Sequence, residues 1–233
     1  MSLVGGLARL LSFLLAGISG APVADLAAGQ ERPLRVLFVG NSFTFGNDLP
    51  QLVAELGLSH DPPVRLEVET AARDGMTLER HWKEGDVARR LTVEAWDVVV
   101  LQEQSARPLT DPELMEAYVR RFAALARDAG TEVILFQTWA SRDDPETEQP
   151  RAATYRRIAA AVGATVAPVG AAWSRALARR PKPALHAADG LHASPAGSRL
   201  AASEILDAIL RLCLRPAHAA ADSSAPVTRI TGC

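Results

Sequence analysis

The sequence is poor in cysteine and has no excess of either charge, and each of these features excludes classes of protein; its scarcity of lysine, with only Lys83 and Lys182, reflects genome composition and excludes nothing. Cys213 and Cys233 are its only cysteines, and neither has a histidine or aspartate partner nearby in sequence, which argues against a cysteine nucleophile. The 25 basic and 27 acidic residues leave a net charge of −2, so nucleic acid is not the expected partner. A Gly-Lys-Ser/Thr phosphate loop and a dinucleotide-binding glycine pattern are also missing.

What is present is the composition of an ordinary globular protein. Hydrophobic residues make up 48% and charged residues 22% of the 233 positions, with 16 glycines and 15 prolines. This excludes collagen-like, coiled-coil and disordered chains. The length is that of one generous domain, which can bury a core without metal ions or disulfide bonds.

The first 30 residues differ from the rest and predict a signal peptide over residues 1–30. Arg9 is the only charge before Asp25, and a short apolar run, Leu10–Ile18, is followed by small residues. The run is too short for a comfortable membrane span. We therefore expect export to the periplasm or the medium, with cleavage between about Ser19 and Gln30 and no membrane association afterwards. The alternative is an additional N-terminal helix of a cytosolic protein.

The C-terminal end is predicted to be a loose tail over residues 216–233, because it is rich in Ala, Ser and Pro. In an exported protein, Cys213 and Cys233 could form a disulfide bond that ties this tail to the last helix. The alternative is two idle thiols. The domain itself is expected over residues 31–215.

Short apolar runs alternate with longer amphipathic segments along this domain. Continuous apolar strands indicate burial on both faces, as in a parallel sheet. We predict an α/β three-layer sandwich with a five-stranded, mainly parallel sheet and right-handed crossovers. The expected strands are 36–39, 64–68, 98–101, 133–136 and 165–169, and the expected helices are 49–58, 78–91, 112–129, 152–162, 171–179 and 194–214.

Ligands of such sheets bind at the carboxyl ends of the strands, so the residues that follow each strand are the candidates for a site. Ser42 follows the first strand in a Gly/Asn turn and is placed either as a nucleophile or as a helix cap. Gly75 follows the second strand, where it either lets a backbone N–H approach a ligand closely or simply forms a turn. Gln102 and Gln104 follow the third strand, as N–H donors or as solvated loop residues.

Asp189 and His192 form the most suggestive pair of the sequence. They lie three residues apart in a glycine-containing loop before the last helix, so the carboxylate can orient the imidazole and leave its other nitrogen free as a base. A metal site formed by His186, Asp189 and His192 is the weaker alternative, because no further ligand cluster is evident.

Together these segments resemble the SGNH (GDSL-type) hydrolase superfamily, in particular exported bacterial members of unassigned substrate. The similarity covers roughly residues 34–214. It rests on the order and spacing of Gly40-Asn41-Ser42-Phe43, Gly75, Leu101-Gln102-Glu103-Gln104-Ser105 and Asp189-Gly190-Leu191-His192. Two positions depart from the family pattern: Asn41 stands in place of the usual aspartate, and a glutamine replaces the asparagine of the third block.

The resemblance implies a serine esterase that acts on small acyl esters, with a carbohydrate O-acetylesterase as one version. Ser42 would be the nucleophile, His192 the base and Asp189 its orienting acid. The oxyanion hole would consist of Ser42, Gly75 and Gln104, with Gln102 as the rival third donor. Neither a metal ion nor an organic cofactor is implied.

Two further residues are candidates for contact with substrate. Asn41 adjoins the nucleophile, and Trp139 follows the fourth strand and could stack on a sugar, with Trp82 and Trp173 as less favoured partners. The alternative for these tryptophans is core packing. Alternative functions on the same fold are a non-catalytic module that binds carbohydrate or peptide, and an acyltransferase that uses the same triad. The oligomeric state is open.

Overall fold

The computed structural model of the chain describes residues 32–213. The signal peptide predicted over residues 1–30 and the tail predicted over residues 216–233 lie outside these residues. The proposed pairing of Cys213 with Cys233 also involves a residue outside them and stays a prediction.

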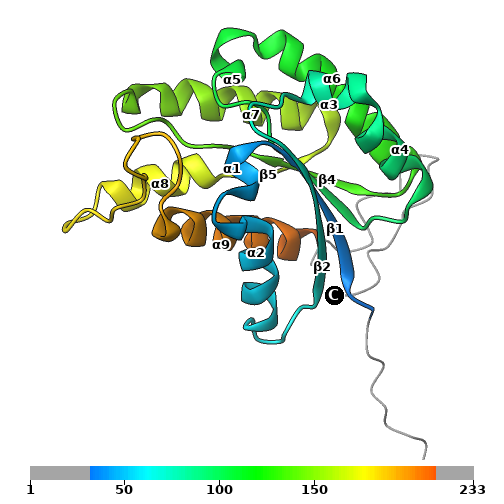
Figure 1. Cartoon of the computed structure of the whole chain (residues 1–233), viewed down its shortest axis with the longest axis horizontal. Helices are drawn as coiled ribbons and strands as arrows, with labels where there is room; N and C mark the ends of the chain where they lie inside the picture. The colour runs from blue at the N-terminus through cyan, green and yellow to red at the C-terminus, as the bar shows by residue number, and fades with distance from the viewer. Residues whose placement is uncertain (1–31, 214–233) are drawn as a thin grey trace, which may run out of the picture. The chain divides into compact units, whose positions relative to one another are not determined.

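The described residues contain a five-stranded sheet in which every neighbouring pair of strands is parallel. Its spatial order is β2-β1-β3-β4-β5, so the chain starts one strand in from an edge, places β2 at that edge and then moves steadily to the other edge (Figure 1). The strands are β1 (Leu34–Gly40), β2 (Leu66–Ala72), β3 (Val98–Leu101), β4 (Glu132–Phe136) and β5 (Thr165–Ala167).

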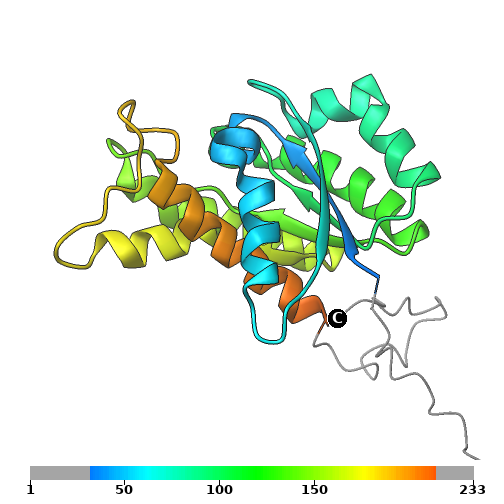
Figure 2. The same ribbon diagram turned by 60° about the horizontal axis from the view of Figure 1, so that its bottom comes forward.

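Helices cover both faces of the sheet, and the predicted three-layer α/β sandwich is thereby confirmed (Figure 1). Successive residues of β1 point to opposite faces: Phe38 packs in one apolar core and Leu37 in the other. The first face carries α2 (Leu49–Leu58), α8 (Val169–Leu177) and α9 (Pro195–Cys213), and the second carries α3 (Leu78–Glu84), α4 (Asp86–Val93), α6 (Pro112–Asp128) and α7 (Glu148–Val162). Figure 2 shows α2 lying beside α9.

Four short elements were not predicted, because a single turn has no apolar periodicity to reveal it. They are α1 (Ser42–Phe45), α5 (Arg107–Thr110) and the 3₁₀ turns η1 (Gly46–Asp48) and η2 (Pro145–Thr147). Both α1 and α5 follow closely on strand ends, where they place residues of the candidate site.

Of the predicted boundaries that differ from the structure, three do so for identifiable reasons. The second strand continues to Ala72 because β2 is an edge strand with partly exposed residues, so its Glu and Thr side chains do not end it. The helix predicted over 78–91 is two helices, because Gly85 adopts φ +79° and closes α3. The fifth strand ends at Ala167, and Val169 already begins α8.

The start of the last helix follows the prediction closely. Ser194 Oγ accepts a hydrogen bond from the backbone N–H of Gly197 at 3.1 Å, and Pro195 is the first helical residue. Within residues 32–213, no helix combines the length and apolar character needed to cross a membrane.

Gly40, the last residue of β1, is required by the close approach of two buried side chains. A Cβ at this position would lie 2.3 Å from Thr44 Oγ1 and 2.4 Å from Gln102 Oε1. We therefore expect Gly40→Ala to lower the free energy of unfolding by about 1–3 kcal/mol, as other overpacking substitutions do. Urea denaturation measures the change.

Gly46→Ala is the matched control for this substitution, because no atom lies within 4 Å of the position that its methyl group would take, and the φ of Gly46 is −57°. It should leave the urea midpoint nearly unchanged. Equal stability of the two variants would contradict the steric role of Gly40.

Candidate active site

Ser42 lies directly after β1 as the first residue of α1, and it does not cap that helix. The cap is Asn41, whose side-chain oxygen accepts the backbone N–H of Phe43 at 3.1 Å. Ser42 is thus free of a structural hydrogen bond of this kind. Its Oγ instead lies 3.0 Å from Nε2 of His192, 150 positions later in the chain.

Asp189 holds the other side of the His192 ring. Its Oδ2 lies 2.6 Å from His192 Nδ1, and its Oδ1 accepts the backbone N–H groups of Leu191 and His192 at 2.9 and 3.0 Å. The hydrogen bond with His192, followed by the two backbone N–H groups, lowers the pKa of Asp189 to about 2. An ionised carboxylate only accepts, so Nδ1 carries the proton and Nε2 is left to accept from Ser42 Oγ.

The loop that carries Asp189 and His192 is anchored to the loop after β4. Trp139 Nε1 donates to Leu191 O at 2.9 Å, and the backbone N–H of Arg142 donates to Gly190 O at 2.8 Å. The acceptors of both hydrogen bonds, Gly190 and Leu191, lie between Asp189 and His192 in the sequence. The position of the imidazole relative to Ser42 therefore depends on the end of β4.

The prediction that Trp139 stacks on a sugar is corrected by its surroundings. Its side chain is 2% exposed, and its ring lies parallel to that of Trp173 at a centroid distance of 4.0 Å. Phe43 contacts the same ring at 4.9 Å. Because the rings of Phe43 and Trp173 pack against it, the Trp139 ring is part of the core, as the core-packing alternative held, and it supports the His192 loop through its bond to Leu191 O.

Asn41 likewise serves the architecture of the site and was wrongly expected to touch substrate. It is 3% exposed, and its side-chain amide donates to Met76 O at 2.9 Å while its oxygen caps α1. The bond to Met76 joins the turn that bears Ser42 to the turn that bears Gly75.

Gly75 is an exposed turn residue with φ +63°, a conformation that favours glycine, and no atom lies within 4 Å of a Cβ placed on it. Among residues 32–213, neither its backbone N–H nor that of Ser42 has a hydrogen-bond acceptor. Both groups are thus available to an incoming oxygen.

The two glutamines after β3 have different environments. Gln102 is fully buried: its Oε1 accepts from the backbone N–H of Asn41 and from Thr44 Oγ1, both at 2.9 Å, and its Nε2 donates to Glu103 O. Gln104 is only half-buried. Its Oε1 caps the start of α5 through Ala106 N at 2.8 Å, and its NH₂ group has no partner among residues 32–213. The rival assignment of Gln102 as an oxyanion donor is therefore wrong, because its amide is already committed.

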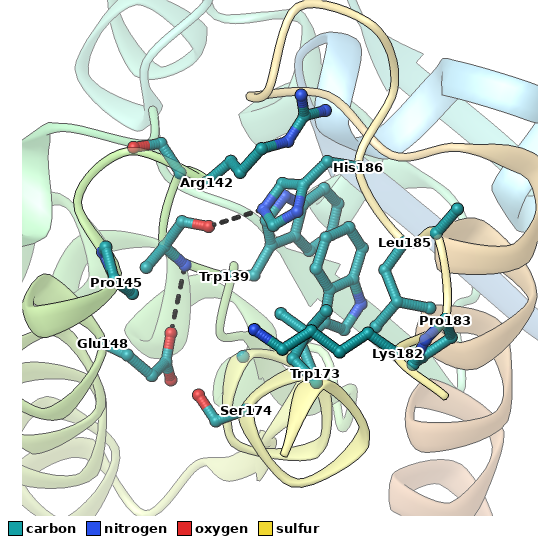
Figure 3. A pocket seen from close by; sticks show the side chains of 15 residues that line it. Trp139, Arg142, Pro145, Glu148, Trp173, Ser174, Lys182, Pro183, Leu185 and His186 are labelled. Carbon is teal, nitrogen blue, oxygen red and sulfur yellow. Dashed lines mark hydrogen bonds between the residues drawn. The ribbon is translucent and has the colours of Figure 1, made fainter. Parts of the chain in front are cut away.

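Two cavities flank the His192 loop. The smaller, about 220 Å³, is lined by residues that include Ser42, Phe43 and His192. The larger, about 460 Å³, lies between the loop after β4, α8 and the loop before α9, and Ser42 is not among its lining residues. Figure 3 shows Trp139 and Trp173 forming one wall of the larger cavity, with Lys182 reaching across it and Glu148 on the opposite side.

His186 lies in the wall of the larger cavity and does not join Asp189 and His192 in a metal site. Its Nε2 is 3.0 Å from Ala140 O, and its ring meets the edge of Trp173 (Figure 3). The described residues contain no group of three or more His, Cys, Asp or Glu side chains that could hold a metal ion.

Sequence reasoning gave no role to Glu103, whose side chain is 1% exposed. The available signal was a charged residue two positions after the wholly apolar β3, where burial obliges a carboxylate to find donors. Glu103 finds them in the backbone N–H groups of Gln104 and Leu78.

The pKa of Asp189 tests the geometry of the pair directly. In the intact protein we expect a value of about 2, measured by carbon-detected NMR of the carboxyl group. In His192→Ala it should rise toward its ordinary value of 3.8, because the side-chain hydrogen bond with His192 is the largest cause of the shift. Ser42→Ala, which leaves that bond intact, should keep the pKa low. An unchanged pKa in His192→Ala would contradict the pairing.

Comparison with known proteins places the chain in a family. Neither a family model nor a curated protein sequence matches it, but solved structures do. A protein of Slackia heliotrinireducens described as an SGNH hydrolase is 32% identical, with a TM-score of 0.67, over 76% of this chain and 100% of that one.

Two more distant structures share the fold. Axe2, an acetylxylan esterase from Geobacillus stearothermophilus, is 19% identical over 77% and 95% of the two chains, with a TM-score of 0.62. TesA is 21% identical over 75% and 97%, with a TM-score of 0.57. The chain therefore belongs to the SGNH hydrolase superfamily.

Proposed function

We propose that this protein is a serine esterase in which Ser42 is the nucleophile, His192 the general base and Asp189 the group that orients the base. The observation that carries the proposal is the 3.0 Å distance between Ser42 Oγ and His192 Nε2, with Asp189 bound to the far nitrogen of the same ring. A serine hydroxyl is a weak nucleophile unless a base of this kind removes its proton.

The reaction proceeds in two acyl transfers. Ser42 Oγ attacks the ester carbonyl carbon and passes its proton to His192 Nε2. The bond from that carbon to the alcohol oxygen then breaks, and the imidazolium returns the proton to the leaving alcohol. Water, deprotonated by His192, attacks the acyl-enzyme, and the acid leaves as Ser42 regains its proton. Asp189 stays ionised throughout and stabilises the imidazolium.

Three N–H donors are assigned to the oxyanion of each tetrahedral intermediate. They are the backbone N–H groups of Ser42 and Gly75 and the side-chain NH₂ of Gln104. The support for this assignment is that all three lack an acceptor among residues 32–213 and belong to turns joined by buried hydrogen bonds, from Asn41 to Met76 and from Leu78 to Glu103. Donors held in place before reaction stabilise developing charge without reorganisation.

The proposed substrates are small acyl esters, with O-acetylated carbohydrate as the leading class. The cavity beside Ser42 is small, about 220 Å³, which suits a short acyl group. Axe2, which shares the fold, is described as an acetylxylan esterase. Its solved forms also include catalytic mutants in which a serine and a histidine are each replaced by alanine.

Ser42→Ala should remove nearly all turnover of short-chain aryl esters and of acetylated sugars, because the hydroxyl that bonds to His192 Nε2 is lost. A fluorophosphonate probe should label the wild-type protein and not this variant. Ser174→Ala is the matched control, since Ser174 is exposed on α8 and lines the other cavity. Wild-type turnover or labelling in Ser42→Ala would overturn the assignment.

Gln104→Ala should lower kcat about a hundredfold or more, which is the usual cost of deleting one oxyanion donor. Gln102→Ala should instead lower the free energy of unfolding by about 1–3 kcal/mol, because Asn41 N and Thr44 Oγ1 would lose a buried acceptor. Steady-state kinetics and urea denaturation of both variants separate the two effects. An unaltered kcat in folded Gln104→Ala would refute the donor role.

A further inference from the structure

Glu103 places one buried carboxylate between the turns that follow β2 and β3. Its Oε1 accepts the backbone N–H of Gln104 at 2.7 Å and the backbone N–H of Leu78 at 3.2 Å. With 1% of its surface exposed, the side chain does not reach solvent or a substrate. A single oxygen atom therefore bridges two backbone segments that are distant in sequence.

Each of the two donors is tied to a proposed oxyanion donor. Leu78 is the first residue of α3, and it follows the turn of Gly75 by three positions. Its N–H has no acceptor within the helix, so Glu103 supplies one from outside. The other donor is the backbone of Gln104, whose side chain supplies the third oxyanion N–H. The separation of these two turns is thus set by the position of Glu103 Oε1.

We propose that Glu103 is a positioning residue that holds the Gly75 turn and Gln104 at the separation the oxyanion hole requires, and that its ionised carboxylate performs this task. The inference rests on the proposed function only for its consequence in catalysis. We call the two hydrogen bonds from the backbone N–H groups of Leu78 and Gln104 to Glu103 Oε1 the clamp. The clamp can be observed without any substrate.

The pKa of Glu103 lies near neutral pH, where its titration can be followed in the folded protein. Burial, the largest influence, raises the pKa of Glu103 to about 7, against the opposing effect of the two backbone N–H groups. The charged and titratable groups around it are Arg107 on α5, which lowers this pKa, Glu79 on α3, which raises it, and Tyr155 on α7. Arg151, also on α7, donates to Ser105 O. As pH rises through about 7, Glu103 ionises and becomes the stronger acceptor.

The kinetics of two Glu103 variants show whether catalysis depends on the hydrogen-bond acceptor at this position. Glu103→Ala should lower kcat about a hundredfold, the order of loss that a small misplacement of catalytic groups causes, with KM for a small aryl ester changing little. Glu103→Gln keeps an oxygen acceptor of the same reach and should recover most of kcat. It should also lose the part of the pH dependence near 7 that Glu103 contributes in the wild-type protein.

The clamp itself is tested by NMR on the full chain. In the wild-type protein the amide resonances of Leu78 and Gln104 should move together through one transition near pH 7, and Glu103→Gln should abolish it. Glu103→Ala should accelerate hydrogen exchange at the same two amides. Glu79→Gln is the matched control: it removes a neighbouring carboxylate that accepts from neither amide, and both amides should still titrate.

The outcomes distinguish this inference from the proposed function. If the wild-type protein neither hydrolyses esters nor reacts with fluorophosphonate, the esterase proposal fails, while the amide titration still decides whether the clamp exists. If Leu78 and Gln104 titrate separately, or exchange at wild-type rates in Glu103→Ala, the clamp is overturned. Wild-type kcat in folded Glu103→Ala would overturn its catalytic consequence.

Discussion

The parallel direction of the five strands is the constraint on which the rest of this structure depends. Because all strands run the same way, every strand delivers its next residues to one edge of the sheet. Ser42 arrives there from β1, Gly75 from β2 and Gln104 from β3. His192 is not carried by a strand end, but its loop is bonded to the residues that follow β4. One edge therefore gathers groups that lie up to 150 positions apart.

Parallel strands bring the turns near one another, and buried polar side chains then set their separation. Gln102 accepts from the turn after β1, Glu103 from α3 and its own turn, and Asn41 donates to Met76. Glu148 does the same after β4: its Oε2 accepts the backbone N–H of Ala140 at 3.1 Å, next to Trp139. Buried acceptors of this kind are costly when unpaired, so each of them restricts its loop to a narrow range of positions.

Much of this fold could be predicted from residue patterns, since apolar runs and helical spacing report burial locally. The strand at 98–101 and the helix at 49–58 coincide with β3 and α2. The predicted boundaries are wrong where the local sequence signal conflicts with strand pairing or with the end of a helix. The edge strand β2 tolerates Glu67 and Glu69 because one side of it faces solvent, and Gly85 divides a helix whose apolar spacing runs through it. Among the candidate site residues, the pattern could single out Ser42, Asp189 and His192, which the structure brings together, because each lies in a glycine-containing turn beside a strand end or a helix start.

The same patterns could not separate Gln102 from Gln104 or assign Glu103 and Trp139. Neighbouring amides have identical chemistry, and only tertiary structure decides which of them is buried against Asn41 and which keeps an NH₂ group without a partner in the described part of the chain. The sequence by itself determined the order of the elements, the parallel sheet and the residue types at its carboxyl edge, because these follow from local burial and backbone preference. Tertiary structure decided which side chains meet across the turns, because a hydrogen bond depends on positions to within a few tenths of an ångström, which no one-dimensional pattern contains.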